Sequence, residues 1–296
     1  SSVVHSVGGW VALAVLLIIG NRTGRFQEGK KRTFQGSNTP LAALGALILW
    51  FGWFGFNGGA NGAMDLRIPL ILINTFLAAS AGLVLSSIMG IYVMKKPEPM
   101  FMITGPIAGL VSITASCAYV EPTEAIIIGS IGGLVSGSGI LLLEKIKVDD
   151  VVSAVPVHLF AGTWATIAVA IFGDLEAMGI ERSMADQLYI QLIGIVSVGA
   201  FCFLSAFTIF FIINLLFRLR VNKVEEDMGL NISEHNASTA THELLQVLNK
   251  QQETDDFSLR APQDPFTEAG VIASQYNNIM DKLEQSENQK NIWKNR

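Results

Sequence analysis

The sequence predicts an all-α, polytopic membrane protein with seven spans and a cytoplasmic helical tail. Three observations lead to this fold class. Half of the 296 residues are hydrophobic and only 15% are charged. The mean hydropathy of +0.45 lies outside the range of soluble globular chains. The apolar residues gather in seven long runs, each near the roughly 20 residues that a helix needs to cross a bilayer.

The seven runs follow one another before the polar tail begins. The last run is longer than a bilayer requires, so we expect this helix to tilt or to extend past the membrane face. Glycines recur in the second and fifth runs, and small residues at such spacing let helices approach closely in lipid. The predicted spans are residues 1–20, 39–57, 68–94, 100–120, 123–143, 151–173 and 188–217.

The charges between the spans predict the orientation of the chain. Basic residues follow the first, third, fifth and seventh spans, whereas the alternate connections carry only Arg67 and Arg182. Because loops rich in Lys and Arg stay on the cytoplasmic side, we expect an inner-membrane protein with a cytoplasmic C-terminus. The basic residues on that side are Arg22, Arg25, Lys30, Lys31, Arg32, Lys95, Lys96, Lys145, Lys147, Arg218, Arg220 and Lys223.

The polar tail predicts two further regions after a membrane domain of residues 1–217: a cytoplasmic region over 218–240 and a helical linker over 241–296. Most of the net charge of −5 comes from this tail, which argues against nucleic acid as a partner. Ile272, Tyr276, Ile279 and Leu283 follow a heptad spacing. They predict either a coiled linker to a signalling domain or an amphipathic helix of a small separate domain. Since the chain starts without Met inside an apolar run, we expect a longer protein.

Two histidines stand alone inside the apolar runs. His5 and His158 are the only side chains there that titrate near physiological pH, because the run interiors hold no Asp, Glu, Lys or Arg. A buried imidazolium without an acidic partner is costly, so we expect both rings to be neutral and to hydrogen-bond each other. Such a pair suits the passage of a small polar molecule or a proton, although each ring could instead be a packing residue. With only Cys117 and Cys202 as further ligands, a metal site is disfavoured.

Five aromatic residues crowd the second run, in LWFGWFGFNGG over residues 49–59. Such a cluster is most often an interfacial belt at the membrane surface. Rings that face a pore would instead attract a small cation by about 0.5–2 kcal/mol each. Because dehydrating that cation costs tens of kcal/mol, it would have to lose its proton before it passes neutral histidines. The residues are Trp50, Phe51, Trp53, Phe54 and Phe56.

Four stretches of the chain resemble successive signature motifs of the ammonium transporter (Amt/Rh) family. They are VVHSVGGWVAL around His5, LWFGWFGFNGG, TGPIAGLVSITASC over 104–117, and VDDVVSAVPVHLFAGTW over 148–164. The resemblance extends to about residue 235. It implies a trimer of eleven-helix subunits, each with one pore and two inverted five-helix repeats. The seven spans resemble helices five to eleven, so we expect the first four helices in a longer protein.

The resemblance also implies roles for individual residues. His5 and His158 correspond to the twin pore histidines, and Thr114 resembles the threonine beside the pore. Phe56 resembles one of two stacked rings that gate the outer entrance, and Trp53 resembles the pore-lining tryptophan. Asp149 and Asp150 match an acidic pair at the start of the second histidine helix, where carboxylates suit the positive end of the helix dipole.

Two departures bear on function. Ala60 occupies the position where many transporters have a serine that binds the cation, and Ser153 stands where an aspartate is usual. The resemblance implies ammonium and ammonia as substrates, membrane lipid around the spans, and a PII-type protein as a candidate partner. It implies no cofactor, no metal and no enzymatic activity for this chain. Two interpretations stay open: an ammonium transporter coupled to signalling, and a non-conducting ammonium sensor of a membrane histidine kinase or diguanylate cyclase.

Overall fold

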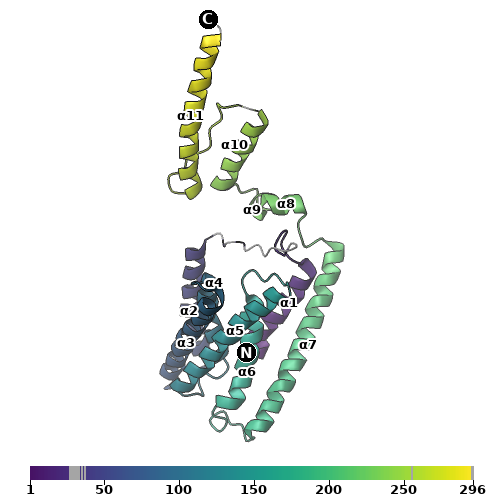
Figure 1. Ribbon diagram of the computed structural model, residues 1–296. Helices are drawn as coiled ribbons and strands as arrows, with labels where there is room; N and C mark the ends of the chain where they lie inside the picture. Colours follow the sequence, from purple (N-terminus) through teal and green to yellow (C-terminus); the bar gives the residue numbers. More distant parts are fainter. Residues whose placement is uncertain (27–33, 35, 37, 255, 295–296) are drawn as a thin grey trace. The chain divides into compact units, whose positions relative to one another are not determined.

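The computed structural model describes residues 1–26, 34, 36, 38–254 and 256–294, with the side chains of the last helix described through residue 286. Lys30, Lys31 and Arg32, which contribute to the predicted orientation, lie outside the described residues. The described part of the chain is helical, without strands, and divides into two compact units (Figure 1). These are Ser1–Arg220 and Val221–Arg296, each considered separately below.

The first unit contains the seven predicted apolar helices in their predicted order, which confirms the fold class. Two of the spans begin with a short π-helix, labelled η, that continues directly into an α-helix. Six spans are long and apolar enough to cross a membrane. The spans are η1 with α1 (Ser2–Ser6, Val7–Ile19), α2 (Thr39–Ala60), α3 (Ile68–Met94), α4 (Pro99–Ile113), α5 (Pro122–Lys145), η2 with α6 (Val155–Phe160, Ala161–Phe172) and α7 (Met184–Leu216).

The fourth span is shorter than predicted. Its helix, α4, has 15 residues, which gives a length of about 22 Å against the ~30 Å of hydrocarbon. The chain continues through turns over residues 114–120. Asn74 of α3, which is fully buried, donates from its amide to the carbonyls of Cys117 and Val120 at 3.0 and 2.8 Å. Irregular backbone in a membrane needs partners of this kind, because lipid supplies none.

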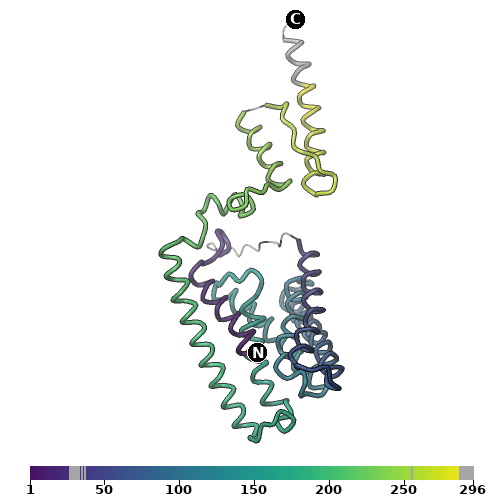
Figure 2. The backbone as a smooth tube through the Cα atoms, turned by 180° about the vertical axis from the view of Figure 1, so that it is seen from behind, coloured from purple at the N-terminus to yellow at the C-terminus, as the bar shows by residue number. Residues whose placement is uncertain are grey.

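Close packing of α3, α4 and α5 forms the core of the first unit. Gly109 of α4 and Gly129 of α5 both lie against the backbone of Ala78, and a Cβ atom at either position would overlap the Ala78 carbonyl group. Glycine is therefore required where these helices meet. The two views agree that α2 and α7 lie on opposite flanks of this unit (Figures 1 and 2).

The seventh span is as long as the sequence predicts. Helix α7 has 33 residues and starts four residues before the predicted span, because the Ser183 hydroxyl caps it by accepting from the backbone N–H of Asp186 at 3.2 Å. Beyond its other end, the Arg220 guanidinium donates to the carbonyl of Ile19 at the end of α1, at 3.2 Å. Trp10 of α1 and Phe203 of α7 meet edge to face between these points.

The second unit contains α8 (Lys223–Met228), α9 (Leu230–Ser233), α10 (Ala240–Thr254) and α11 (Glu268–Lys294). Helices α10 and α11 pack around Leu244, Ala261 and Ala273. The Asn277 side chain both donates to and accepts from the backbone of Ala261, at 2.9 Å each. This unit begins at Val221, and the boundary expected at residue 240 stays a prediction.

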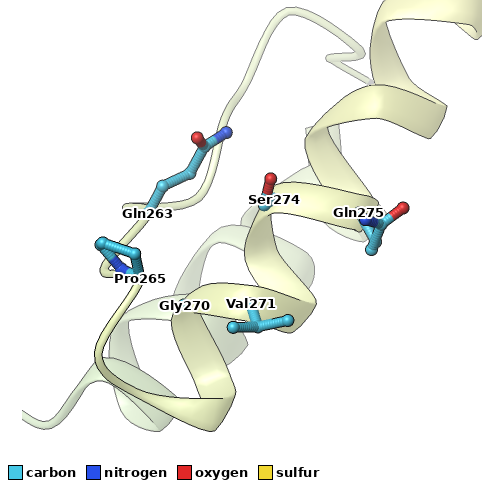
Figure 3. A pocket seen from close by; sticks show the side chains of 6 residues that line it. All are labelled: Gln263, Pro265, Gly270, Val271, Ser274 and Gln275. Atoms are coloured by element: carbon cyan, nitrogen blue, oxygen red, sulfur yellow. The ribbon is translucent and has the colours of Figure 1, made fainter.

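The predicted heptad face of α11 is largely unused within the chain. Tyr276 packs against the α10 core, whereas Ile272, Ile279 and Leu283 are 44–60% exposed. The coiled linker therefore stays a prediction. A shallow pocket of about 300 Å³ at the start of α11 is lined by residues without charged side chains (Figure 3). They are Gln263, Pro265, Gly270, Val271, Ser274 and Gln275.

Candidate functional site

Each of the two membrane histidines lies in a π-helical segment at the start of a span. His5 is in η1 and only 7% exposed, and His158 is in η2 and half-buried. Single π-helical turns are rare and occur frequently at functional sites. Pro156, which lacks an N–H, lies in the first turn of η2, where a missing donor costs little. The unusual backbone therefore coincides with the two residues that the sequence singles out.

The structure brings the two imidazoles together. Their ring centroids are 5.6 Å apart and their planes differ by 19°. On the other side of His5, the Trp53 ring lies at 5.2 Å with an interplanar angle of 16°. Phe56 completes the group, 5.9 Å from His5 and 5.7 Å from Trp53. We call these four rings, His5, His158, Trp53 and Phe56, the aromatic cluster.

One expectation for this cluster is wrong. The sequence led us to expect a hydrogen bond between the two imidazoles, but the structure has none between these described residues. The 5.6 Å separation leaves the rings in contact without an aligned N–H···N pair. Nε2 of His5 is buried and has no partner among the described protein atoms. A buried polar atom of this kind needs an explanation, and a functional role is one of those known.

Thr114 reaches the cluster through Trp53. Nε1 of Trp53 donates to Oγ1 of Thr114 at 2.9 Å, and Oγ1 of Thr114 donates to the Leu110 carbonyl at 2.7 Å. The threonine hydroxyl is thus occupied on both sides. Its geometry fits a residue that fixes the tryptophan ring, and Trp53 is correspondingly buried, with 9% exposure.

Several polar residues near the cluster were missed by the sequence reasoning. Ser2 shares a 2.6 Å hydrogen bond with Thr166, and Ser6 is buried with an unpaired hydroxyl. Asn57, next to Phe56, is 2% exposed and donates to Thr75 at 2.8 Å, while its carbonyl oxygen is unpaired. The available signal was a polar amide inside an apolar run, which a search limited to ionisable residues passes over.

Asp149 and Asp150 lie in the loop before η2 and have different partners. Asp149 accepts from Nε and Nη2 of Arg22 at 2.7 and 2.9 Å, and from the Arg22 backbone N–H at 3.0 Å. This carboxylate therefore ties the end of α1 to the loop that leads to His158. Asp150 instead accepts from the N–H groups of Ala154 and Val155 at 3.0 and 2.7 Å, which caps η2.

The pKa values of the two carboxyl groups are shifted in opposite directions. Burial acts to raise the pKa of Asp149, but the hydrogen bonds and charge of Arg22, together with the charge of Arg25, outweigh it and hold this pKa below its usual value. Burial raises the pKa of Asp150, against the effect of the backbone N–H groups that it accepts from. Thus the acidic pair divides into an ion-pair member and a helix cap.

The two departures from the family pattern are placed differently. Ala60 is exposed at the last position of α2 and offers no polar atom there beyond its backbone. Ser153 is 3% exposed and has a φ of 58°, in the left-handed region, within the turn that Asp150 closes. Among the described residues, no group of three or more His, Cys, Asp or Glu side chains is placed to hold a metal ion.

Comparison with known proteins decides the family. The model of the Ammonium Transporter Family matches residues 1–240, most of the chain. The chain belongs to the ammonium transporter family. Ammonium transporter Amt2 of Archaeoglobus fulgidus is 40% identical over 250 residues, which cover 80% of this chain and 53% of that protein. The ammonium transporter of Bacillus subtilis is 33% identical over 240 residues, covering 79% of this chain and 58% of that protein.

A solved structure described as a Sensor Amt Protein matches this ammonium transporter family member with a TM-score of 0.76 and 38% identity, covering 79% of this chain and 58% of that one. Saccharomyces cerevisiae Mep2 matches with a TM-score of 0.68 and 25% identity, covering 75% and 52%. The chain thus spans about half the length of the relatives it matches. Family membership and the apolar helices together make it a multi-pass membrane protein.

Proposed function

We propose that the full-length protein transports ammonium across the membrane, and that ammonia passes along the aromatic cluster. The observation that carries this proposal is Nε2 of His5, a buried nitrogen without a protein partner among the described residues, held beside a second imidazole. A small molecule with N–H donors and a lone pair can satisfy such an atom whichever tautomer the ring adopts. Membership of the ammonium transporter family supports ammonia as that molecule.

The surroundings of His5 supply the other steps of the proposed route. The faces of Trp53 and Phe56 attract an ammonium cation by about 0.5–2 kcal/mol each but cannot replace its hydration shell. The cation then releases its proton to water on the outer side, because carrying the charge into a dry segment is far more costly than carrying neutral ammonia. Ammonia continues past His5 and His158, which exchange hydrogen bonds with it as it moves.

The test is uptake of ammonium by proteoliposomes that contain the full-length protein. Replacing His5 or His158 by Ala removes the group that receives ammonia, and we expect uptake to fall at least about tenfold, the equivalent of one hydrogen bond of roughly 1.4 kcal/mol. His235→Ala, at an exposed position after α9, is the matched control and should leave uptake unchanged. Wild-type uptake in both the His5→Ala and the His158→Ala variant would refute the role of the two histidines.

A non-conducting sensor is the second candidate. Two observations favour it: the similarity to a protein described as a Sensor Amt Protein, and Ala60 at the position of the usual cation-binding serine. A sensor would bind ammonium and alter the output of a domain beyond the tail without useful flux. Ligand-dependent output in the absence of liposome uptake would favour the sensor, and uptake would favour the transporter.

The proposal extends to the assembly and orientation of the protein. The family resemblance supports a homotrimer in the inner membrane, with lipid around each subunit, and a PII-type protein as a candidate regulator. The loop charges support a cytoplasmic C-terminus. We assign no enzymatic activity to this chain. Mass measurement of the purified assembly in native conditions, with and without an added PII-type protein, tests the trimer and the partner.

A further inference from the structure

The two histidine segments share a pattern that the proposed function does not use. Each histidine is followed four residues later by a glycine: His5 by Gly9, and His158 by Gly162. Each of these glycines lies against the other histidine's segment. Gly9 packs on Leu159, the residue after His158, and Gly162 packs on Ser6, the residue after His5. The contacts are therefore reciprocal.

The separation at these contacts leaves no room for a side chain. A Cβ atom at Gly9 would overlap the backbone nitrogen of Leu159 and lie 2.6 Å from its Cβ atom. A Cβ atom at Gly162 would lie 2.9 Å from Oγ of Ser6, 3.2 Å from the backbone nitrogen of Ser6 and 3.3 Å from Cβ of His5 itself. Carbon atoms pack at about 3.5–4.0 Å, so a methyl group at Gly9 would force the segments apart by about 1 Å.

Not every glycine of these spans lies in such close contact with another segment. A Cβ atom at Gly8, the neighbour of Gly9, would meet no atom of the described residues within 4 Å, so their packing does not require glycine there. In contrast, Gly9 and Gly162 lie where the backbone of one histidine segment meets the other. The two imidazoles belong to these same segments, and their ring centroids are 5.6 Å apart.

We infer that Gly9 and Gly162 are positioning residues, which set the distance between the His5 and His158 rings through their reciprocal contacts. Because it concerns the same pair of rings, the inference rests on the proposed function for its consequence in transport, but its geometric part stands alone. The two sites differ in strictness. The nearest obstacle at Gly9 is a backbone nitrogen, whereas the nearest obstacle at Gly162 is a removable serine hydroxyl, with the backbone nitrogen of Ser6 farther away at 3.2 Å.

The experiment compares Gly9→Ala, Gly162→Ala and the matched control Gly8→Ala in the full-length protein. The first readout is the distance between the two rings in a solved structure of each variant, supported by the ¹⁵N NMR signals of the two imidazoles. The second is ammonium uptake, separated into maximal rate and half-saturating concentration. We expect Gly9→Ala to separate the rings by about 1 Å and to lower the maximal rate at least tenfold, with little change in half-saturation. Gly8→Ala should match the wild type.

Gly162→Ala gives a graded test if Gly9→Ala fails to fold. Its ring shift should be a few tenths of an ångström and its loss of rate smaller, because Oγ of Ser6 can move. Adding Ser6→Ala removes the nearest obstacle but leaves the Ser6 backbone nitrogen at 3.2 Å and Cβ of His5 at 3.3 Å, so the double variant should regain part of the lost rate and of the ring distance. A purely structural loss of stability would not be reversed in ring geometry by removing one hydroxyl.

The outcomes separate the two ideas. Unchanged ring distance and NMR signals in Gly9→Ala, or in Gly162→Ala with no effect of Ser6→Ala, would overturn the positioning role. Separated rings with unchanged uptake would support the positioning role and refute the proposed function of the histidine pair. Separated rings with reduced uptake would support both.

Discussion

The hydroxyl of Thr114 illustrates how much a single residue decides in this site. It links Trp53 of α2 to the end of α4 through two hydrogen bonds, across 61 positions of sequence. Residue types and motif positions were sufficient to nominate both residues. Their pairing could not be predicted, because it depends on where α4 ends, and the sequence predicted a longer helix.

Removing that hydroxyl tests its role. Thr114→Val keeps the side-chain shape but leaves Nε1 of Trp53 unpaired in a buried setting, which costs about 1–3 kcal/mol. We expect a lower unfolding temperature and reduced ammonium uptake, measured on the full-length protein in detergent and in liposomes. Thr114→Ser retains the hydroxyl and is the control. Equal behaviour of the valine and serine variants would contradict the supporting role.

The residue-scale predictions from sequence were correct about proximity and wrong about bonding. His5, His158, Trp53 and Phe56 lie together; the isolation of the two histidines and the family resemblance of the two aromatic residues had nominated them. Whether two rings stack or share a hydrogen bond depends on distances of a few tenths of an ångström, which residue patterns do not encode. Asn57 and its orphaned oxygen were missed because an amide has no charge to draw attention to it.

At the scale of elements, hydrogen bonds of the loop before η2 connect the end of α1 to the start of η2, two segments far apart in the sequence. Asp150 satisfies the first N–H groups of η2, since its carboxylate accepts from Ala154 and Val155. Asp149 holds the end of α1 through Arg22. The sequence placed both acids at the helix start but assigned them one role. Only the fold reveals that α1 supplies the cation for one of them.

The Asp149–Arg22 pair predicts an acid-dependent loss of stability. The folded pKa of Asp149 is lowered below the unfolded value of about 3.9, so its contribution is present above about pH 4 and is lost as the pH falls through the folded pKa. We expect Asp149→Asn to destabilise the protein by about 1–3 kcal/mol at pH 7, less than for a fully buried pair because Arg22 is 38% exposed.

Thermal unfolding of the variant and the wild type between pH 7 and pH 3 measures this contribution. The two curves should converge as the wild-type carboxylate is protonated. Arg22→Gln should lose a similar amount at pH 7, and the double variant should lose less than the sum, because both changes break one interaction. A constant difference across the pH range would exclude the ion pair as the cause.

For the whole molecule, the sequence predicted the class of fold, the number of apolar helices and their order. The seven runs were sufficient because a bilayer fixes the length of a span within narrow limits. The exception was α4, whose irregular continuation depends on the buried amide of Asn74 from another helix. The packing of α11 could not be predicted either, because a heptad spacing does not identify the helix that its apolar face contacts.

The orientation of the whole molecule is testable by labelling. In a variant with Cys117 and Cys202 replaced by Ala, a cysteine at Glu181 should react with an impermeant maleimide on intact cells, because this exposed position lies on the predicted outer side. A cysteine at Lys96, on the predicted cytoplasmic side, should react only after the membrane is permeabilised. The reverse pattern would invert the proposed topology.

The hydrogen bond from Arg220 to the end of α1 has a consequence for the opposite end of α7. It ties the chain just beyond the end of α7 to the Ile19 end of α1. The 33 residues of α7 rise about 50 Å, whereas the hydrocarbon core of a bilayer is about 30 Å thick. Because the excess cannot be taken up where the ends are tied, α7 must lean strongly or extend by several turns beyond the hydrocarbon at its Met184 end.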